Sequence, residues 1–164
     1  MKFRLLYFLF INLFIQVGCI HFKLGESEPQ KSLNISFKEP LSPFVISKNT
    51  DADQAWESNK TGNIIAITSN CSKNSDKSLN FAFQEIAKGF DRVDSSNQTS
   101  LFFNGREALR GSVSGTIDGI SVSMETLQFN KNQCFYQLTY SGVSKNFESE
   151  QHYFEQFLKD FKAP

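Results

Sequence analysis

The sequence predicts an α+β fold in which an antiparallel sheet of about six strands packs with two amphipathic helices. Apolar and polar residues alternate through 109–125 and 134–140, which is the period of half-buried strands. Two other segments, 79–90 and 147–162, repeat apolar residues every three or four positions, which is typical of helices with one buried face. The 164 residues, 40% of them hydrophobic, suffice for one layered domain but hardly for two.

The first half of the domain is expected to consist of three strands and a helix. The strands are an entering segment at 41–46, a short strand at 55–57 and a β-branched strand at 64–71. The helix is expected to end at Gly89, and its N-cap residue is Asp76 or Ser78. Its apolar stripe, which needs a sheet to cover, consists of Leu79, Phe83, Ile86 and Phe90.

A meander of strands is expected to follow. Short strands at 92–94 and 101–103 lead to the turn pair Asn104-Gly105. In the next strand, Gly111 and Gly115 are expected to let an aromatic side chain or a helix approach closely.

Asp118-Gly119 is the strongest local signal and predicts a two-residue hairpin. The apolar phase of the strand after this hairpin changes at Thr126. We expect a β-bulge near Thr126 to cause the change.

The last strand and a closing helix complete the predicted domain. One face of the strand consists of Cys134, Tyr136, Leu138 and Tyr140. The helix is expected over 147–162, with its apolar side made by Phe147, Phe154, Phe157, Leu158 and Phe161. Glu148 and Glu150 lie near its start, where acidic residues complement the helix dipole.

The N-terminus has the layout of a secretory signal. A basic start, Lys2 and Arg4, precedes an apolar run over 5–15 that is too short to cross a bilayer core, for which about 20 residues are needed. The run ends at Ile15-Gln16-Val17-Gly18-Cys19, which resembles the lipobox of bacterial lipoproteins, although Gln16 stands where that motif usually has an aliphatic residue.

The lipobox resemblance implies that Cys19 is acylated and becomes the first residue of the mature protein. Ile20 after it favours the outer membrane under the enterobacterial sorting rule. An ordinary signal peptide that leaves Cys19 free is the alternative. The chain is therefore divided into a signal peptide (1–18), a lipidated cysteine with a flexible tether (19–40) and a single globular domain (41–164).

A family resemblance covers the predicted domain. Uncharacterised bacterial lipoproteins with the PsbP-like fold, a sandwich, are similar to this chain at turns, core positions and cysteines. The matching positions are Pro40, Pro43-Phe44, Ala55-Trp56, Thr61-Gly62-Asn63, Cys71, Arg106, Ala108-Leu109, Asp118-Gly119, Cys134, Tyr136, Leu138, Tyr140 and the phenylalanines of the last helix. Since known members of the fold are mostly accessory or binding proteins, the resemblance implies non-enzymatic work.

Cys71 and Cys134 are expected to form a disulfide. They sit at the end of one predicted strand and the start of another, and an exported chain meets an oxidising compartment. Two buried free thiols are the alternative. The pairing would leave Cys19 as the odd cysteine, available for acylation.

No catalytic, metal or cofactor site is predicted. Only His21 and His152 are present, and neither has a second histidine at ligand spacing. A hydrolase would need His152 beside an acid and a nucleophile, but 111–115 carries Val113 where a nucleophile elbow needs serine. Asp51-Ala52-Asp53 begins like a calcium loop but is not followed by the glycine and glutamate of that loop.

The predicted function is that of a lipid-anchored envelope protein that binds another envelope component. Its 17 basic and 17 acidic residues form no long run of either sign, so nucleic acid is excluded as a partner. The alternative is a periplasmic carrier or sensor that holds a small apolar ligand between helix and sheet. A groove for a ligand or partner would be lined by Trp56, Tyr136, Tyr140 and Tyr153, for which core packing is the other interpretation.

Overall fold

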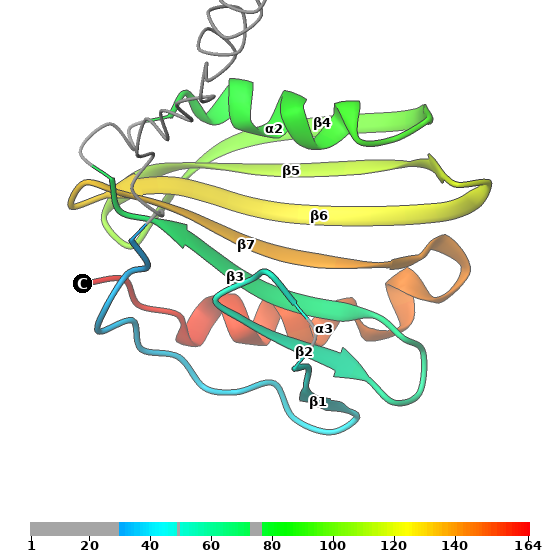
Figure 1. The fold of residues 1–164 in the computed structure, drawn as a ribbon, viewed down its shortest axis with the longest axis horizontal. Helices are drawn as coiled ribbons and strands as arrows, with labels where there is room; N and C mark the ends of the chain where they lie inside the picture. Colours follow the sequence, from blue (N-terminus) through cyan, green and yellow to red (C-terminus); the bar gives the residue numbers. More distant parts are fainter. Residues whose placement is uncertain (1–29, 49, 73–76) are drawn as a thin grey trace, which may run out of the picture.

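The computed structural model describes residues 30–48, 50–72 and 77–164, which form a curved seven-stranded antiparallel sheet with two helices (Figure 1). The strand order is β1-β2-β3-β7-β6-β5-β4. The sheet has seven strands, one more than the sequence predicted. The elements are β1 (Phe44–Ile46), β2 (Gln54–Ser58), β3 (Ile64–Asn70), α2 (Leu79–Lys88), β4 (Arg92–Phe103), β5 (Arg106–Ile117), β6 (Ile120–Lys131), β7 (Cys134–Val143) and α3 (Ser144–Asp160). Among the described residues, no helix is long and apolar enough to cross a membrane.

Tight turns set the register of the meander. Asp118 and Gly119 have φ of 51° and 76°, and the flanking pair Ile117 and Ile120 faces across the strands, so the predicted hairpin is confirmed. Asn104 and Gly105 have the same left-handed backbone at the turn between β4 and β5.

Helix α2 follows the sequence signals closely. It begins after the N-cap Ser78, whose hydroxyl accepts from the Phe81 amide, and it ends at Gly89. The alternative N-cap, Asp76, lies outside the described residues. Helix α3 begins at Ser144, three residues before the predicted start, directly after β7.

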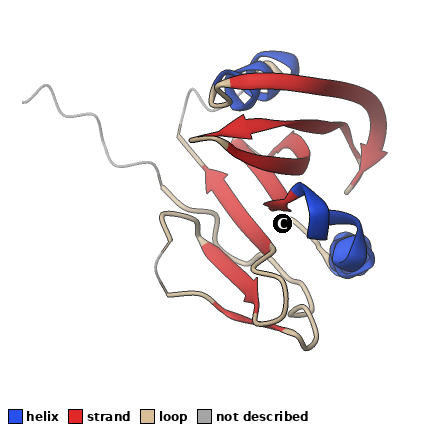
Figure 2. Ribbon diagram, turned by 90° about the vertical axis from the view of Figure 1, so that its right-hand side faces the viewer, coloured by secondary structure: helices blue, strands red, loops and turns tan. Residues whose placement is uncertain are grey.

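The two helices cover opposite faces of the sheet (Figure 2). Helix α2 and the alternate residues of β5 and β6 form a small cluster made by Leu79, Phe83, Ile86, Ala87, Phe90, Leu109, Val113, Ile117, Val122 and Met124. Helix α3 covers the other face and the larger cluster, which includes Trp56, Ile65, Ile67, Leu127, Phe129, Tyr136, Leu138, Tyr140, Phe154, Phe157, Leu158 and Phe161. The domain therefore has two cores rather than one, which we call the α2 core (the smaller cluster) and the α3 core (the larger cluster).

The change of apolar phase in β6 results from these two cores. Val122 and Met124 pack toward α2, whereas Leu127 and Phe129 pack toward α3. The pairing of β6 with both neighbours runs through Thr126 without a shift, so the expected bulge is wrong. The strand moves from one core to the other while its pleat stays regular.

Strand β4 is continuous, although the sequence predicted two short pieces. It pairs with β5 from Arg92 to Phe103, with one irregularity between Val93 and Ser95. Its middle is polar because the strand lies at the sheet edge and most of its residues are exposed. A two-residue alternation is therefore missing from this part of the sequence.

Residues 30–40, which we call the strap, pack onto the domain instead of forming a flexible tether. The carbonyl of Gln30 accepts from the Cys71 amide at 2.8 Å. The Phe37 ring meets Trp56 edge to face, with centroids 5.5 Å apart. The predicted flexible tether is therefore wrong for the strap, because its isolated apolar residues fill the α3 core without any sequence period.

Gly111 allows the close approach that its position in the sequence predicted. A Cβ at Gly111 would lie 2.2 Å from the Phe83 ring, so α2 packs directly on the backbone of β5. We expect Gly111→Ala to lower the free energy of unfolding by about 1–3 kcal/mol, because the ring must move within a filled core. Denaturant unfolding measures this change, with Ser112→Ala at an exposed residue as the control. If Gly111→Ala and Ser112→Ala unfold at the same denaturant concentration, the close packing of α2 on β5 is contradicted.

Candidate functional site

The four aromatic residues predicted to line a groove do not form one. Trp56, Tyr136 and Tyr140 are fully buried in the α3 core, as the alternative interpretation expected. Tyr153 alone lines a surface pocket. The predicted groove at these positions is therefore wrong, because the side chains that it needs at the surface pack against the phenylalanines of α3 and the strap.

A groove between helix and sheet exists at another place, between α2 and β7. Its volume is about 450 Å³. It is lined by Lys77, Ser78, Phe81, Ala82, Glu85, Ile86, Phe135 and Gln137. We call it the α2–β7 groove. It forms because α2 packs on β5 and the first part of β6 and leaves this part of β7 beside the helix uncovered.

The lining of the α2–β7 groove is apolar with charges at its edge. Phe81 points away from the α2 core and is largely exposed. The Lys77 ammonium lies 5.5 Å from the centroid of the Phe135 ring. Glu85 is paired with Lys88 at 2.6 Å. The arrangement suits a ligand with an apolar body and an anionic end near Lys77.

Three buried oxygens lie on the sheet face that carries this groove. Thr126 Oγ1, Gln128 Oε1 and Asn130 Oδ1 follow each other on one face of β6 and have no hydrogen-bond partner within residues 30–48, 50–72 and 77–164. Gln128 lies directly opposite Gln137 of β7, and its Nε2 donates to Gln137 Oε1 at 2.9 Å. An unpaired buried oxygen is costly, and ordered water or a ligand that donates hydrogen bonds commonly satisfies it.

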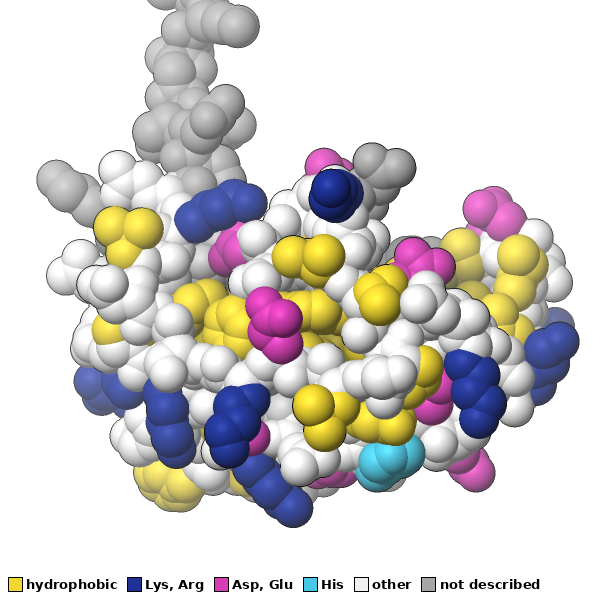
Figure 3. Space-filling model, turned by 90° about the horizontal axis from the view of Figure 1, so that it is seen from below, with side chains coloured by type: hydrophobic (Ala, Val, Ile, Leu, Met, Phe, Trp, Pro, Cys, Tyr) yellow, Lys and Arg dark blue, Asp and Glu magenta, His cyan; other side chains and the backbone are white. Residues whose placement is uncertain are grey.

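A smaller pocket of about 250 Å³ lies between the strap and α3. Pro40 and Leu41 line one side, and Tyr153 and Phe157 line the other. Figure 3 looks at the underside of the molecule, where hydrophobic side chains show in hollows that are framed by polar and charged ones. The pocket is the gap that remains where the strap crosses the helix.

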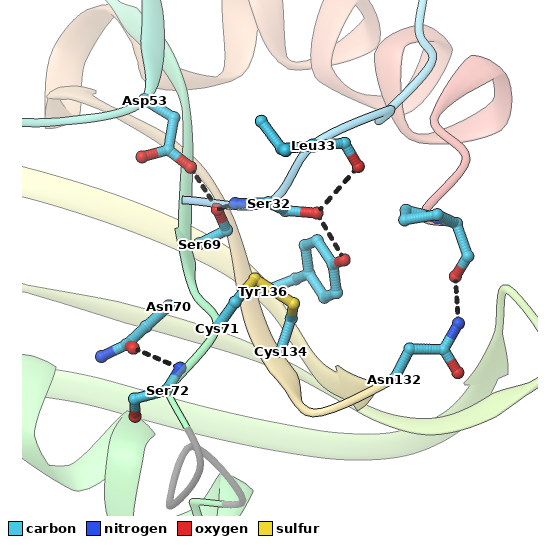
Figure 4. Close-up of a disulfide and its surroundings, with 11 residues drawn as sticks. Ser32, Leu33, Asp53, Ser69, Asn70, Cys71, Ser72, Asn132, Cys134 and Tyr136 are labelled. Carbon is cyan, nitrogen blue, oxygen red and sulfur yellow. Dashed lines mark hydrogen bonds between the residues drawn. A yellow bond between two sulfur atoms is a disulfide. The ribbon is translucent and has the colours of Figure 1, made fainter. Parts of the chain in front are cut away.

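The Cys71–Cys134 disulfide is formed and joins the end of β3 to the start of β7 (Figure 4). The strap crosses it: the Ser32 amide donates to Ser69 Oγ at 2.8 Å, and the Ser32 hydroxyl is 2.7 Å from Tyr136 Oη. The chain thus enters the described domain beside the cystine.

A buried polar cluster fastens α3 to the β2–β3 turn. Glu150 is only 4% exposed and accepts from Ser58 Oγ at 3.0 Å, from Asn63 Nδ2 at 3.3 Å and from the Thr61 hydroxyl. The predicted helix-start role is wrong for both glutamates, because α3 begins at Ser144 and has no acidic residue in its first turn. Glu150 points into the protein, while Glu148 is exposed.

Tyr140 belongs to the same cluster. Its hydroxyl accepts from Asn63 Nδ2 at 2.8 Å and donates to the Phe147 carbonyl at 2.6 Å. Burial, reinforced by the charge of Glu150, raises the pKa of Tyr140 well above its ordinary value. The phenol therefore stays protonated and acts as a structural donor.

A second buried charge lies under the middle of α3. Arg110 of β5 binds the carboxylates of Glu125 and Glu155, and Gln151 Nε2 donates to Glu125 Oε2 at 2.7 Å. Burial opposes the charged guanidinium, but the hydrogen bonds and charges of the two carboxylates outweigh it and raise the pKa of Arg110. The guanidinium bridges the two carboxylates and so holds the helix to the sheet.

Of the residues considered for catalysis or metal binding, His152, Asp51 and Asp53 lie within the described residues. His152 is exposed, and its ring lies tilted against that of Tyr153, with centroids 4.1 Å apart. Asp53 pairs with Lys31 of the strap at 3.4 Å. Among the described residues, no three His, Cys, Asp or Glu side chains gather in a way that could hold a metal ion. Cys19 and His21 lie outside the described residues.

Sequence reasoning missed the α2–β7 groove. Its residues belong to α2 and β7, and each is ordinary in its own element. The one available signal was Phe81, an aromatic residue off the apolar stripe of its helix.

Comparison with known proteins identifies the fold. No protein-family model matches the sequence, and no curated protein matches it. The structure is similar to that of LpqN of Mycobacterium tuberculosis, described as involved in cell envelope biogenesis, with a TM-score of 0.58 and 10% identity over 85% of this chain and 87% of that one. It is also similar to cyanobacterial PsbP (CyanoP) from Synechocystis sp. PCC 6803, with a TM-score of 0.51 and 10% identity over 87% of this chain and 96% of that one. At such identities the likeness establishes the fold, which is PsbP-like.

Proposed function

We propose that this PsbP-like protein is a non-catalytic binding or accessory domain of the bacterial cell envelope, anchored through lipid on Cys19 and located at the outer membrane. One observation carries the proposal: the disulfide uses Cys71 and Cys134, so the third cysteine is left at the end of an apolar export signal. Cys19 is not needed for a structural disulfide, since Cys71 and Cys134 already cross-link the domain.

The core supports a binding role without catalysis. The aromatic residues of the larger cluster under α3 are packed against each other, and the buried charges of Glu125 and Glu150 are bound by neighbouring side chains. Each group is occupied in holding α3 to the sheet. The partner proposed for this domain is another envelope protein.

The position of the anchor is consistent with a domain held near the bilayer. Ten residues separate Cys19 from Gln30, the first described residue. Even fully extended, the eleven Cα–Cα steps from Cys19 to Gln30 span at most about 40 Å. A lipid on Cys19 would therefore keep the disulfide end of the sheet within that distance of the membrane surface.

Membrane fractionation with fatty-acid labelling tests the anchor. In a bacterial host grown with an alkyne fatty acid, we expect the wild-type protein to carry label and to leave membranes only with detergent, because two or three acyl chains anchor stably. Cys19→Ala should carry no label. Cys19→Ala that is labelled as strongly as wild type, or an unlabelled wild type, would overturn the proposal.

A second candidate function is a carrier or sensor for a small amphipathic ligand, and the α2–β7 groove favours it. The groove combines exposed Phe81 with the cation of Lys77 and lies beside buried oxygens that lack partners in the described part of the chain. The chemistry predicts an apolar chain with an anionic end and a hydrogen-bond donor.

Titration with 11-(dansylamino)undecanoic acid tests this candidate, because the probe carries an apolar chain, a carboxylate and an N–H donor. We expect Phe81→Asp to raise its dissociation constant about tenfold or more, whereas Val45→Asp, an exposed apolar residue outside the groove, should leave it unchanged. Equal dissociation constants for the two variants would exclude the groove.

A further inference from the structure

We infer that two copies of this chain pair through strand β4, which forms one edge of the sheet. Two edges exist among the described strands, β1 and β4, and they differ greatly. β1 has three residues and follows Pro43, so it offers little backbone for pairing. β4 has twelve residues and is paired on one side only, with β5.

The β4 edge lacks the usual protection against pairing. From Ser95 to Phe103 it contains no charge and no proline, and its register with β5 is regular. Its bulge and its charged pair, Arg92 with Asp94, are confined to the first residues. Exposed edges of this kind accept a further strand because their backbone groups are unpaired within the sheet.

The side chains of β4 are complementary to a second copy of β4. Val93 and Phe102 are 42% and 84% exposed. Both point to the α2 side of the sheet, because they pair with residues of β5 on the face that carries Val113. They lie at opposite ends of the strand.

A two-fold axis at Gln98 uses this arrangement. In an antiparallel pair with Gln98 facing Gln98 of the second copy, Ser96 faces Ser100 and Phe102 faces Asp94. Asp94 is the extra residue of the bulge, and Val93 lies next to it, within reach of the Phe102 ring. Two equivalent apolar pairs are then buried, and the uncharged centre brings no like charges together. A second copy fits this edge because the apolar side chain at one end of each strand meets the apolar side chain at the opposite end of its partner.

Cysteine cross-linking in intact cells tests the pairing. With the full chain carrying Gln98→Cys, we expect oxidation to give a disulfide-linked species of twice the chain mass, since directly opposite Cβ atoms lie about 5 Å apart. Glu57→Cys, exposed on β2, is the matched control, and the unsubstituted chain gives the background from Cys19.

A second substitution separates specific pairing from chance collision. Adding Phe102→Asp to Gln98→Cys should lower the cross-linked fraction at least about fivefold, because a buried apolar cross-strand pair is lost and two charges enter the interface. Val45→Asp, at an exposed apolar residue of β1, should leave the fraction unchanged. Cross-linking no greater than that of Glu57→Cys, insensitivity to Phe102→Asp, or a product whose mass reveals a different protein would overturn the inference.

Discussion

Removing the disulfide by the double substitution Cys71→Ser and Cys134→Ser is expected to lower the free energy of unfolding by roughly 4 kcal/mol. The bond closes a loop with a sequence separation of 63 residues, which contains α2 and most of the meander. Without it, the unfolded chain gains the entropy of that open loop. Urea unfolding followed by circular dichroism measures the change.

Reduction of the wild-type protein is the matched control for this experiment. A reductant should move the wild-type midpoint to that of the double variant and should leave the variant unchanged. If the variant and the oxidised wild type unfold at the same urea concentration, the disulfide does not stabilise the domain and this prediction fails.

Replacing Glu150 with alanine is expected to lower the free energy of unfolding by about 3 kcal/mol, because Ser58, Thr61 and Asn63 lose a common buried acceptor. The cluster joins α3 to the β2–β3 turn, so the loss also loosens the cover of the larger core. Thermal unfolding of the wild type and the variant measures it.

Glu148→Ala tests whether the effect belongs to the buried cluster. Glu148 lies two residues earlier in the same helix and is exposed. Its removal should change stability by less than about 0.5 kcal/mol. If Glu148→Ala and Glu150→Ala destabilise equally, the hydrogen bonds of the buried cluster do not account for the loss.

Local chemistry explains why much of the fold could be predicted. The Asp118-Gly119 hairpin needs only two residues that accept a left-handed backbone, and α2 is delimited by Ser78 and Gly89. The cysteine pair could also be predicted, because two of the three cysteines fall at strand ends. Each of these signals lies within a few residues of the feature that it predicts.

The parts that could not be predicted depend on tertiary position. β4 is a strand because β5 offers it a partner, although its polar middle has no alternation. Glu150 is buried because the β2–β3 turn brings three donors to it from about 90 residues away in the chain. The α2–β7 groove lies where two elements do not contact each other, and no local sequence pattern predicts such a gap.

Mass spectrometry of the N-terminal peptide tests the central proposal most directly. After purification from bacterial membranes and proteolysis, we expect the first residue to be Cys19, carrying diacylglycerol on its sulfur and an acyl chain on its amino group. A mature protein that begins elsewhere, or that begins at Cys19 with an unmodified thiol, would contradict the lipid anchor and with it the proposed place of this domain in the envelope.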